Sequence, residues 1–388
     1  MNNSFEKKQR INSFAFVFLI FVYSITTIFS LVANQGIVII LTSVVLLGPI
    51  LLLNIKYLKV SIVYALLFEF IILVILLIHK NRYPLNSSTI DEIIMQLLGI
   101  GTLSIVIGTL DNNIVYVEKY FGVLSILCFF TSFVYLILVR GNFLLSMRFG
   151  YAMLPSAVWF LCSYIKKRKV GWLLLFILAT VLLITYGSRG TLLCIAMALV
   201  LIAVKCKWWW LLLFTLVFMV FSNVFFQLLE QGLQWLANLT GSRKILNLIL
   251  LFQGDITDAS SGRDTLYSRC IQLFHENPFG NGVGFWQSDS FMYGLYPHNI
   301  LLEIAVEFGV FGILIFSIIL VSIIIKLFRL DLFSFFPYAA LFSICFGRLM
   351  VSSTFWSRPE FWLIVSVFLF NPPQKQGSTT YQYHFGNG

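Results

Sequence analysis

One histidine and several arginines are the residues of this sequence that could do chemistry on a phosphorylated substrate. His298 lies in the stretch "YPHNILLE", which we expect to open an apolar helix with the histidine in its first turn. The positive end of a helix disfavours an imidazolium, and a neutral imidazole can accept a proton as a general base. A histidine at a helix start can also be purely structural. The residues that accompany it therefore have to be considered before a catalytic role is assigned.

Arginines that suit an anion occur in two stretches before the histidine. The stretch "YGSRGTLL" sets Arg189 between glycines at a helix start, where backbone amides can approach an anion. The stretch "SSGRDTLYSRC" places Arg263 in the first turn of an expected helix, with Tyr267 near the same face and Arg269 further along. A guanidinium binds phosphate through two parallel hydrogen bonds, although a surface helix with solvated charges is the alternative.

Further candidates lie in and after the apolar run that follows the histidine. Glu303 and Glu307 fall inside this run, where carboxylates are costly and usually functional or paired. Glu303 could orient an arginine or the histidine. The stretch "FGRLMVSSTFWSRPEFW" adds Arg348 and Arg358, the second of which could form a local ion pair with Glu360. A neutral histidine beside several arginines suits an activated hydroxyl and a diphosphate leaving group.

No pattern in the sequence predicts a metal site or a cofactor. Asp255, Asp258 and Asp264 could together hold a divalent ion, but no histidine is interleaved with them. The six cysteines show neither the spacing of a metal site nor that of a disulfide framework. We therefore expect the chemistry to be independent of metal.

The composition excludes a water-soluble fold. The chain has 388 residues, of which 59% are hydrophobic and only 11% charged, whereas soluble domains carry about 25% charged residues. Apolar runs recur from Ile11 to Phe370, and runs of about 20 residues cross the membrane as helices. The net charge of +10 is scattered through short loops, which favours anionic lipid or a phosphorylated lipid substrate over nucleic acid. The sequence predicts an all-α polytopic membrane protein.

About twelve membrane-spanning helices are expected. They cover residues 12–32, 36–53, 58–79, 93–110, 120–139, 149–165, 170–187, 191–204, 208–226, 298–325, 332–350 and 356–371. With this count the lysine-rich loops fall on one side, which is cytoplasmic by the positive-inside rule and holds both termini. Most arginines fall on the other side, where a need for phosphate binding would explain them.

These spans divide the chain into four parts. Residues 1–226 hold the first nine spans, and residues 227–297 form one large extracytoplasmic loop with amphipathic helices. Residues 298–372 hold the last three spans, and residues 373–388 form a cytoplasmic tail. Loops of such length are usually functional.

Several motifs resemble the O-antigen polymerase and O-antigen ligase superfamily of bacteria. These are "GSRG" at a span end, "SGR" and "NPFGNGVG" in the long loop, and "PHNILLEIAVEFGVFG" at the next span. The resemblance implies a glycosyltransferase C-like fold of twelve helices and a sugar chain carried on undecaprenyl diphosphate. It also implies metal-independent transfer with inversion at the anomeric carbon. Arg189 and Arg263 match the family's diphosphate-binding arginines, and His298 matches its proposed catalytic histidine.

The resemblance and the topology together give the expected function and site. We expect a polymerase that joins lipid-linked repeat units into O-antigen or capsular polysaccharide on the outer face of the plasma membrane. The alternatives are a ligase that transfers the glycan to lipid A–core or another acceptor, and a transporter of the same lipid. A chain-length regulator and a flippase are expected partners. The expected catalytic residues are His298, Arg263 and Arg189, and the expected substrate-binding residues are Arg269, Tyr267, Asn299, Glu303, Arg348 and Arg358.

Overall fold

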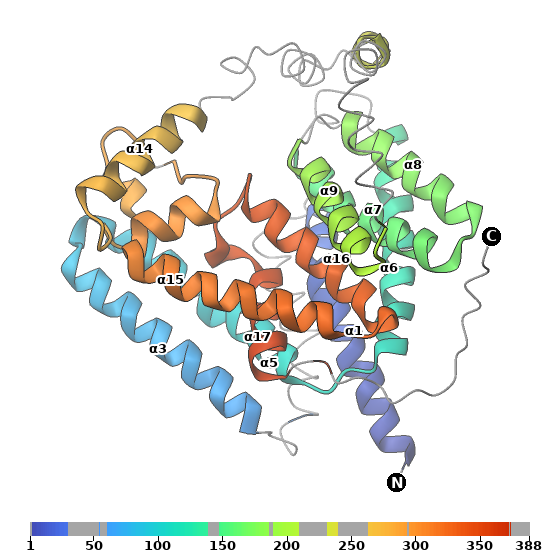
Figure 1. Cartoon of the computed structure of the whole chain (residues 1–388), viewed down its shortest axis with the longest axis horizontal. Helices are drawn as coiled ribbons and strands as arrows, with labels where there is room; N and C mark the ends of the chain where they lie inside the picture. Colours follow the sequence, from blue (N-terminus) through green and yellow to red (C-terminus); the bar gives the residue numbers. More distant parts are fainter. Residues whose placement is uncertain are drawn as a thin grey trace.

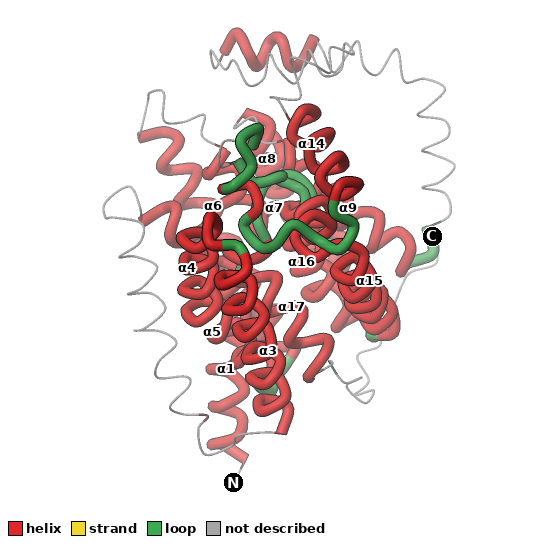
Figure 2. Tube along the Cα trace, turned by 90° about the vertical axis from the view of Figure 1, so that its left-hand side faces the viewer, coloured by secondary structure: helices red, strands yellow, loops and turns green. Residues whose placement is uncertain are grey.

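The computed structural model is built from helices. It describes residues 2–29, 54, 60–138, 147–185, 189–208, 231–239, 263–292, 295–371 and 373. These residues contain no strand, and nearly all of the described chain is drawn as helix in Figure 2. An all-helical chain suits a membrane, because a helix satisfies its backbone groups internally.

Six helices are long and apolar enough to cross a membrane, and three shorter apolar helices accompany them. By their length and composition these helices support a multi-pass membrane protein, while the number twelve stays a prediction. The predicted spans 36–53 and 208–226, apart from Trp208, lie outside the described residues, as does the tail beyond residue 373. The six long helices are Phe5–Ile28, Val60–Arg82, Pro84–Thr109, Ile114–Val134, Ile300–Arg329 and Leu332–Leu349.

The helices follow the predicted spans closely. The first half contains α1 (Asn2–Phe29), α3 (Val60–Arg82), α4 (Ser87–Gln96), α5 (Thr102–Thr109), α6 (Ile114–Leu138) and α7 (Met147–Lys167). The second half contains α8 (Val170–Thr185), α9 (Arg189–Lys205), α14 (Arg263–Glu276), α15 (Ile300–Arg329), α16 (Leu332–Leu349) and α17 (Pro359–Phe370). The predicted span 93–110 is not one regular helix, because a π-helical turn at Leu97–Gly101 separates α4 from α5.

The centre of the bundle is formed by α1, α7, α16 and α17, whose side chains are mostly buried. Helix α1 packs against α6 and α7, α9 packs against α16, and α5 packs against α17 (Figure 1). Helices α3 and α15 lie at the outside and expose rows of large apolar side chains. Exposed apolar rows suit contact with lipid, since lipid tails are as apolar as the side chains themselves.

Most described loop segments gather at one end of the bundle, beside α14 and away from the N-terminus (Figure 2). Helix α14 ends at Glu276, and the stretch "NPFGNG" begins at the next residue, where proline and glycine favour a turn.

Helix α15 is broken at Gly309, which the sequence analysis did not predict. Gly309 has φ +65° and ψ −153°, and this conformation leaves carbonyls before it without their helical partners. The "NPFGNG" loop supplies replacements. The amide of Asn281 donates to the carbonyl of Val306 at 2.7 Å, and the amide of Val310 donates to the carbonyl of Pro278 at 2.9 Å. Backbone hydrogen bonds therefore hold the "NPFGNG" loop against the break in α15.

Replacing Gly309 with alanine should destabilise the protein strongly. A Cβ at this position would lie far inside the van der Waals radius of the Pro278 carbonyl oxygen and would also be strained by the positive φ. We expect a loss of about 3 kcal/mol or more, seen as a lower apparent melting temperature in detergent. Gly171→Ala is the control, because a Cβ there meets nothing within 4 Å. Equal melting temperatures for the two variants would contradict the proposed role of the break.

Candidate functional site

His298 precedes α15 and does not lie in its first turn, which corrects the predicted start of this span at residue 298. The helix begins at Ile300, and Asn299 is its N-cap. The side-chain oxygen of Asn299 accepts hydrogen bonds from the amides of Leu301 at 2.9 Å and Leu302 at 3.3 Å. His298 itself has φ +56°, a left-handed conformation that is uncommon for residues other than glycine. The cap and this backbone conformation fix the direction in which the histidine leaves the helix.

The imidazole of His298 is held neutral by its surroundings. Its ring lies against the ring of Tyr296, with centroids 4.1 Å apart. Burial, and then the charge of Arg263, lower the pKa of His298 to about 4. The Nδ1 atom is buried and has no hydrogen-bond partner. A neutral, unengaged imidazole is what a general base needs before substrate binds.

Arg348 and Arg358 lie close together at the end of α16 and just before α17. The guanidinium of Arg348 is 3.9 Å from the ring centroid of Tyr23 and 4.6 Å from that of Tyr151. The guanidinium of Arg358 is 5.2 Å from the same Tyr23 ring. Burial and the charge of Arg348 lower the pKa of Arg358 to about 10. The site is therefore strongly positive even though its cations are shielded from water.

Tyr296 links the histidine to these arginines. Its hydroxyl donates to the carbonyl oxygen of Ser352 at 3.0 Å, within the segment that joins Arg348 to Arg358. Burial raises the pKa of Tyr296, and the charges of the two arginines and of Arg263 act in the opposite direction. Three of the five predicted arginines, Arg263, Arg348 and Arg358, thus lie within electrostatic reach of one hydroxyl.

Arg263 is the first residue of α14, as predicted, and Arg189 is the first residue of α9. The charge of Arg263 acts on both His298 and Tyr296. The side chain of Arg189 lies outside the described residues. The next residue, Gly190, packs directly against the Tyr151 hydroxyl, and a Cβ there would clash with it. The start of α9 therefore lies beside the ring that covers Arg348.

Arg269 and Tyr267 are placed differently from the other predicted binding residues. Arg269 is paired with Asp289, whose carboxylate accepts from its guanidinium at 2.6 and 3.1 Å, and with Glu276 at 3.6 Å. These contacts attach α14 to the turn that follows it. Tyr267 is partly buried on α14. A substrate contact of Arg269 or Tyr267 stays a prediction.

The two carboxylates of α15 join the loops around the site. Glu307 accepts hydrogen bonds from the Gly284 amide and from the Trp356 indole, both at 3.1 Å. Thr354 donates to one oxygen of Glu303, and the second oxygen of Glu303 is buried without a partner. The sequence analysis singled out both glutamates but not their partners, which lie about 50 residues further along the chain or in the "NPFGNGVG" loop. Tyr23 and Tyr151 were also missed, because they lie far in sequence from the arginines that they contact.

Glu307→Gln should weaken the junction between α15 and the segment before Arg358. A glutamine amide has one oxygen, so one of the two buried donors would lose its acceptor, at a cost of about 1–3 kcal/mol. We expect a lower apparent melting temperature. The effect should shrink when Trp356 is already phenylalanine, since the indole donor is then absent. Fully additive effects of the two substitutions would show that the indole contact does not contribute.

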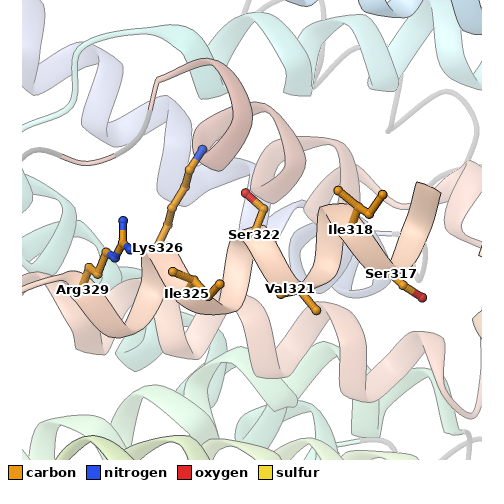
Figure 3. Close-up of a pocket in the computed structure, with 7 residues that line it drawn as sticks. All are labelled: Ser317, Ile318, Val321, Ser322, Ile325, Lys326 and Arg329. Carbon is orange, nitrogen blue, oxygen red and sulfur yellow. The ribbon is translucent and has the colours of Figure 1, made fainter. Parts of the chain in front are cut away.

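Metal ligands do not cluster in the described part of the chain, where no three histidine, cysteine, aspartate or glutamate side chains come together. Asp255 and Asp258 lie outside the described residues, and Asp264 is exposed on α14. A cavity of about 480 Å³ lies elsewhere, along the far end of α15 from His298. Its lining side chains, including Lys326 and Arg329, come from this single helix, so it is separate from the histidine site (Figure 3).

A comparison with protein families bears on the class of this site. Residues 173–317 match the family model described as O-antigen ligase. The match is consistent with the O-antigen polymerase and ligase superfamily that the motifs predicted. No curated protein and no solved structure matches the chain.

The O-antigen ligase region covers most of α8, all of α9 and α14, and α15 as far as Ser317. It contains Arg189, Arg263 and His298, whereas Arg348 and Arg358 lie beyond it. The family implies a glycosyltransferase-like membrane enzyme of O-antigen assembly that acts on lipid-linked glycans. The O-antigen ligase match does not distinguish a polymerase from a ligase.

Proposed function

We propose that this protein polymerises undecaprenyl-diphosphate-linked repeat units into a bacterial surface polysaccharide. The observation that supports the proposal is a neutral, half-buried histidine inside the O-antigen ligase region, near two arginines whose Nε atoms are buried without a partner. The site would face the periplasm or cell exterior, with both termini in the cytoplasm.

The reaction would be a direct displacement at the anomeric carbon of the donor. Arg263 and Arg189 hold the diphosphate and stabilise the charge that it gains as it leaves. His298 takes the proton from an acceptor hydroxyl as its oxygen bonds to the anomeric carbon. The bond between that carbon and the phosphate oxygen breaks, its electron pair leaves with the diphosphate, and the configuration inverts.

Purified protein in liposomes tests this function. The liposomes contain one undecaprenyl-diphosphate repeat unit of the host and EDTA, and the glycans are separated on a gel. A ladder would support a metal-independent polymerase. Transfer only after lipid A–core is supplied would instead identify a ligase, and no transfer to either acceptor would contradict glycosyl transfer.

A further inference from the structure

Arg348 and Arg358 have no hydrogen-bond acceptor or carboxylate partner among the described residues, although Arg348 is only 4% exposed. Their Nε atoms are buried and unpartnered. Glu360 is buried nearby and its charge acts on Arg358, but it forms no ion pair with either guanidinium, and one of its oxygens is also unpartnered. Buried charged groups of native proteins are almost always paired or hydrogen-bonded. Among the described residues, this cluster therefore lacks an anion that is hydrogen-bonded to its guanidiniums.

The tyrosines around the pair support the same conclusion. The ring of Tyr23 lies within 3.9 Å of one guanidinium and 5.2 Å of the other, and Tyr151 contacts the first. An aromatic face attracts a cation but does not accept its in-plane N–H groups. Those groups bind the oxygens of phosphate or carboxylate most strongly. The tyrosines thus hold two guanidiniums in place and leave their hydrogen-bonding capacity unused.

The pair comes from a different part of the chain than the arginine that acts on the histidine. The charge of Arg263 acts on His298 and on Tyr296, whereas the charges of the pair act on Tyr296, whose ring covers the imidazole and whose hydroxyl is bound at Ser352. The pair comes from α16 and from the residue before α17, beyond the O-antigen ligase region. Positive charge from two separate parts of the chain therefore acts on Tyr296, the residue whose ring lies against the histidine.

We propose that Arg348 and Arg358 bind an oxyanion carried by the acceptor. The inference rests on the proposed function, in which Arg263 and Arg189 already hold the diphosphate of the donor. A second cationic group beside the same general base then fits a second anionic substrate. The oxyanion is a phosphate or a sugar carboxylate, because both offer the paired oxygens that a guanidinium binds.

Binding of a soluble acceptor, without donor, tests the proposal independently of turnover. The probe is the host's repeat-unit oligosaccharide released from its lipid as the 1-phosphate, with the full chain in lipid nanodiscs. Two matched probes have the phosphate removed or the sugar carboxylates reduced. We expect wild type to bind the intact probe about 10-fold or more tightly than one of the altered probes, and the altered probe identifies the anion. Arg348→Gln and Arg358→Gln should abolish this preference.

Three comparisons make the test decisive. Arg82→Gln removes an exposed arginine that also lies over a tyrosine ring, and it should keep the preference. Where a glutamine variant does not fold, the lysine variant of the same residue keeps the charge and should lower the preference without removing it. Equal binding of all probes by wild type overturns the proposal. Loss of the preference in Arg263→Gln but not in the pair also overturns it, because the anion would then bind at the donor arginine.

Discussion

His298→Ala is expected to lower the rate of glycan transfer by about 10²–10⁴-fold, the usual contribution of a positioned general base. The imidazole is a neutral base on which the charge of Arg263 acts, and its buried Nδ1 atom has no hydrogen-bond partner. The readout is the initial rate of ladder formation with saturating lipid-linked repeat unit. His275→Ala is the control, because His275 is exposed in the last turn of α14, about three turns from Arg263. Near-normal turnover of the His298 variant would refute the general-base role.

The pH dependence gives a second check on the same residue. The pKa of His298 is lowered to about 4, so the imidazole is already neutral at pH 5 and above. The value of kcat/KM reports the free enzyme. It should therefore stay flat from about pH 8 to pH 5 and fall as the pH drops through 4, where the base becomes protonated. Rates without enzyme must be subtracted, since acid cleaves the donor by itself. A fall centred near pH 6.5 would mean that the site does not depress the pKa.

Arg263→Gln is expected to lower the transfer rate by about 10²–10³-fold, because a preorganised charge at the leaving group would be lost. Arg263→Lys should recover part of this loss, since an ammonium keeps the charge without the planar fork. Arg269→Gln, on the same helix, is the comparison. Its arginine is occupied by Asp289 and Glu276, so we expect a lower melting temperature and a rate within about 10-fold of wild type. A larger rate loss for Arg269 than for Arg263 would reverse the assignment of the two residues.

The membrane-spanning helices could be predicted because hydropathy depends on local sequence alone. The predicted spans 58–79 and 332–350 correspond to α3 and α16 within a few residues. The break in α15 could not be predicted in this way. A single glycine in an apolar run usually continues the helix, and Gly309 departs from it only because the backbone of Pro278 and Asn281 supplies the hydrogen bonds. Such long-range bonds leave no periodic signal in the sequence.

The sequence indicated which residue types belong to the candidate site, but not which side chains contact one another there. Chemistry and topology singled out Arg263, Arg348 and His298. In the structure the charges of both arginines act on Tyr296, whose ring lies against the imidazole of His298. The partner of Arg269 could not be inferred, because carboxylates are common in the same loop. Tyr23 was not identified either, since one tyrosine in an apolar span carries no distinctive pattern. Whether an arginine is free for substrate or committed to a carboxylate depends on tertiary packing.

The break at Gly309 also frees the first part of α15 from the task of spanning the membrane. Residues 310–329 rise about 30 Å as a helix, which by itself matches the hydrocarbon thickness. Residues 300–308 are then available to follow His298 and to bind the loops around the site through Glu303 and Glu307. One interrupted helix thus combines a membrane span with a separate support for the base.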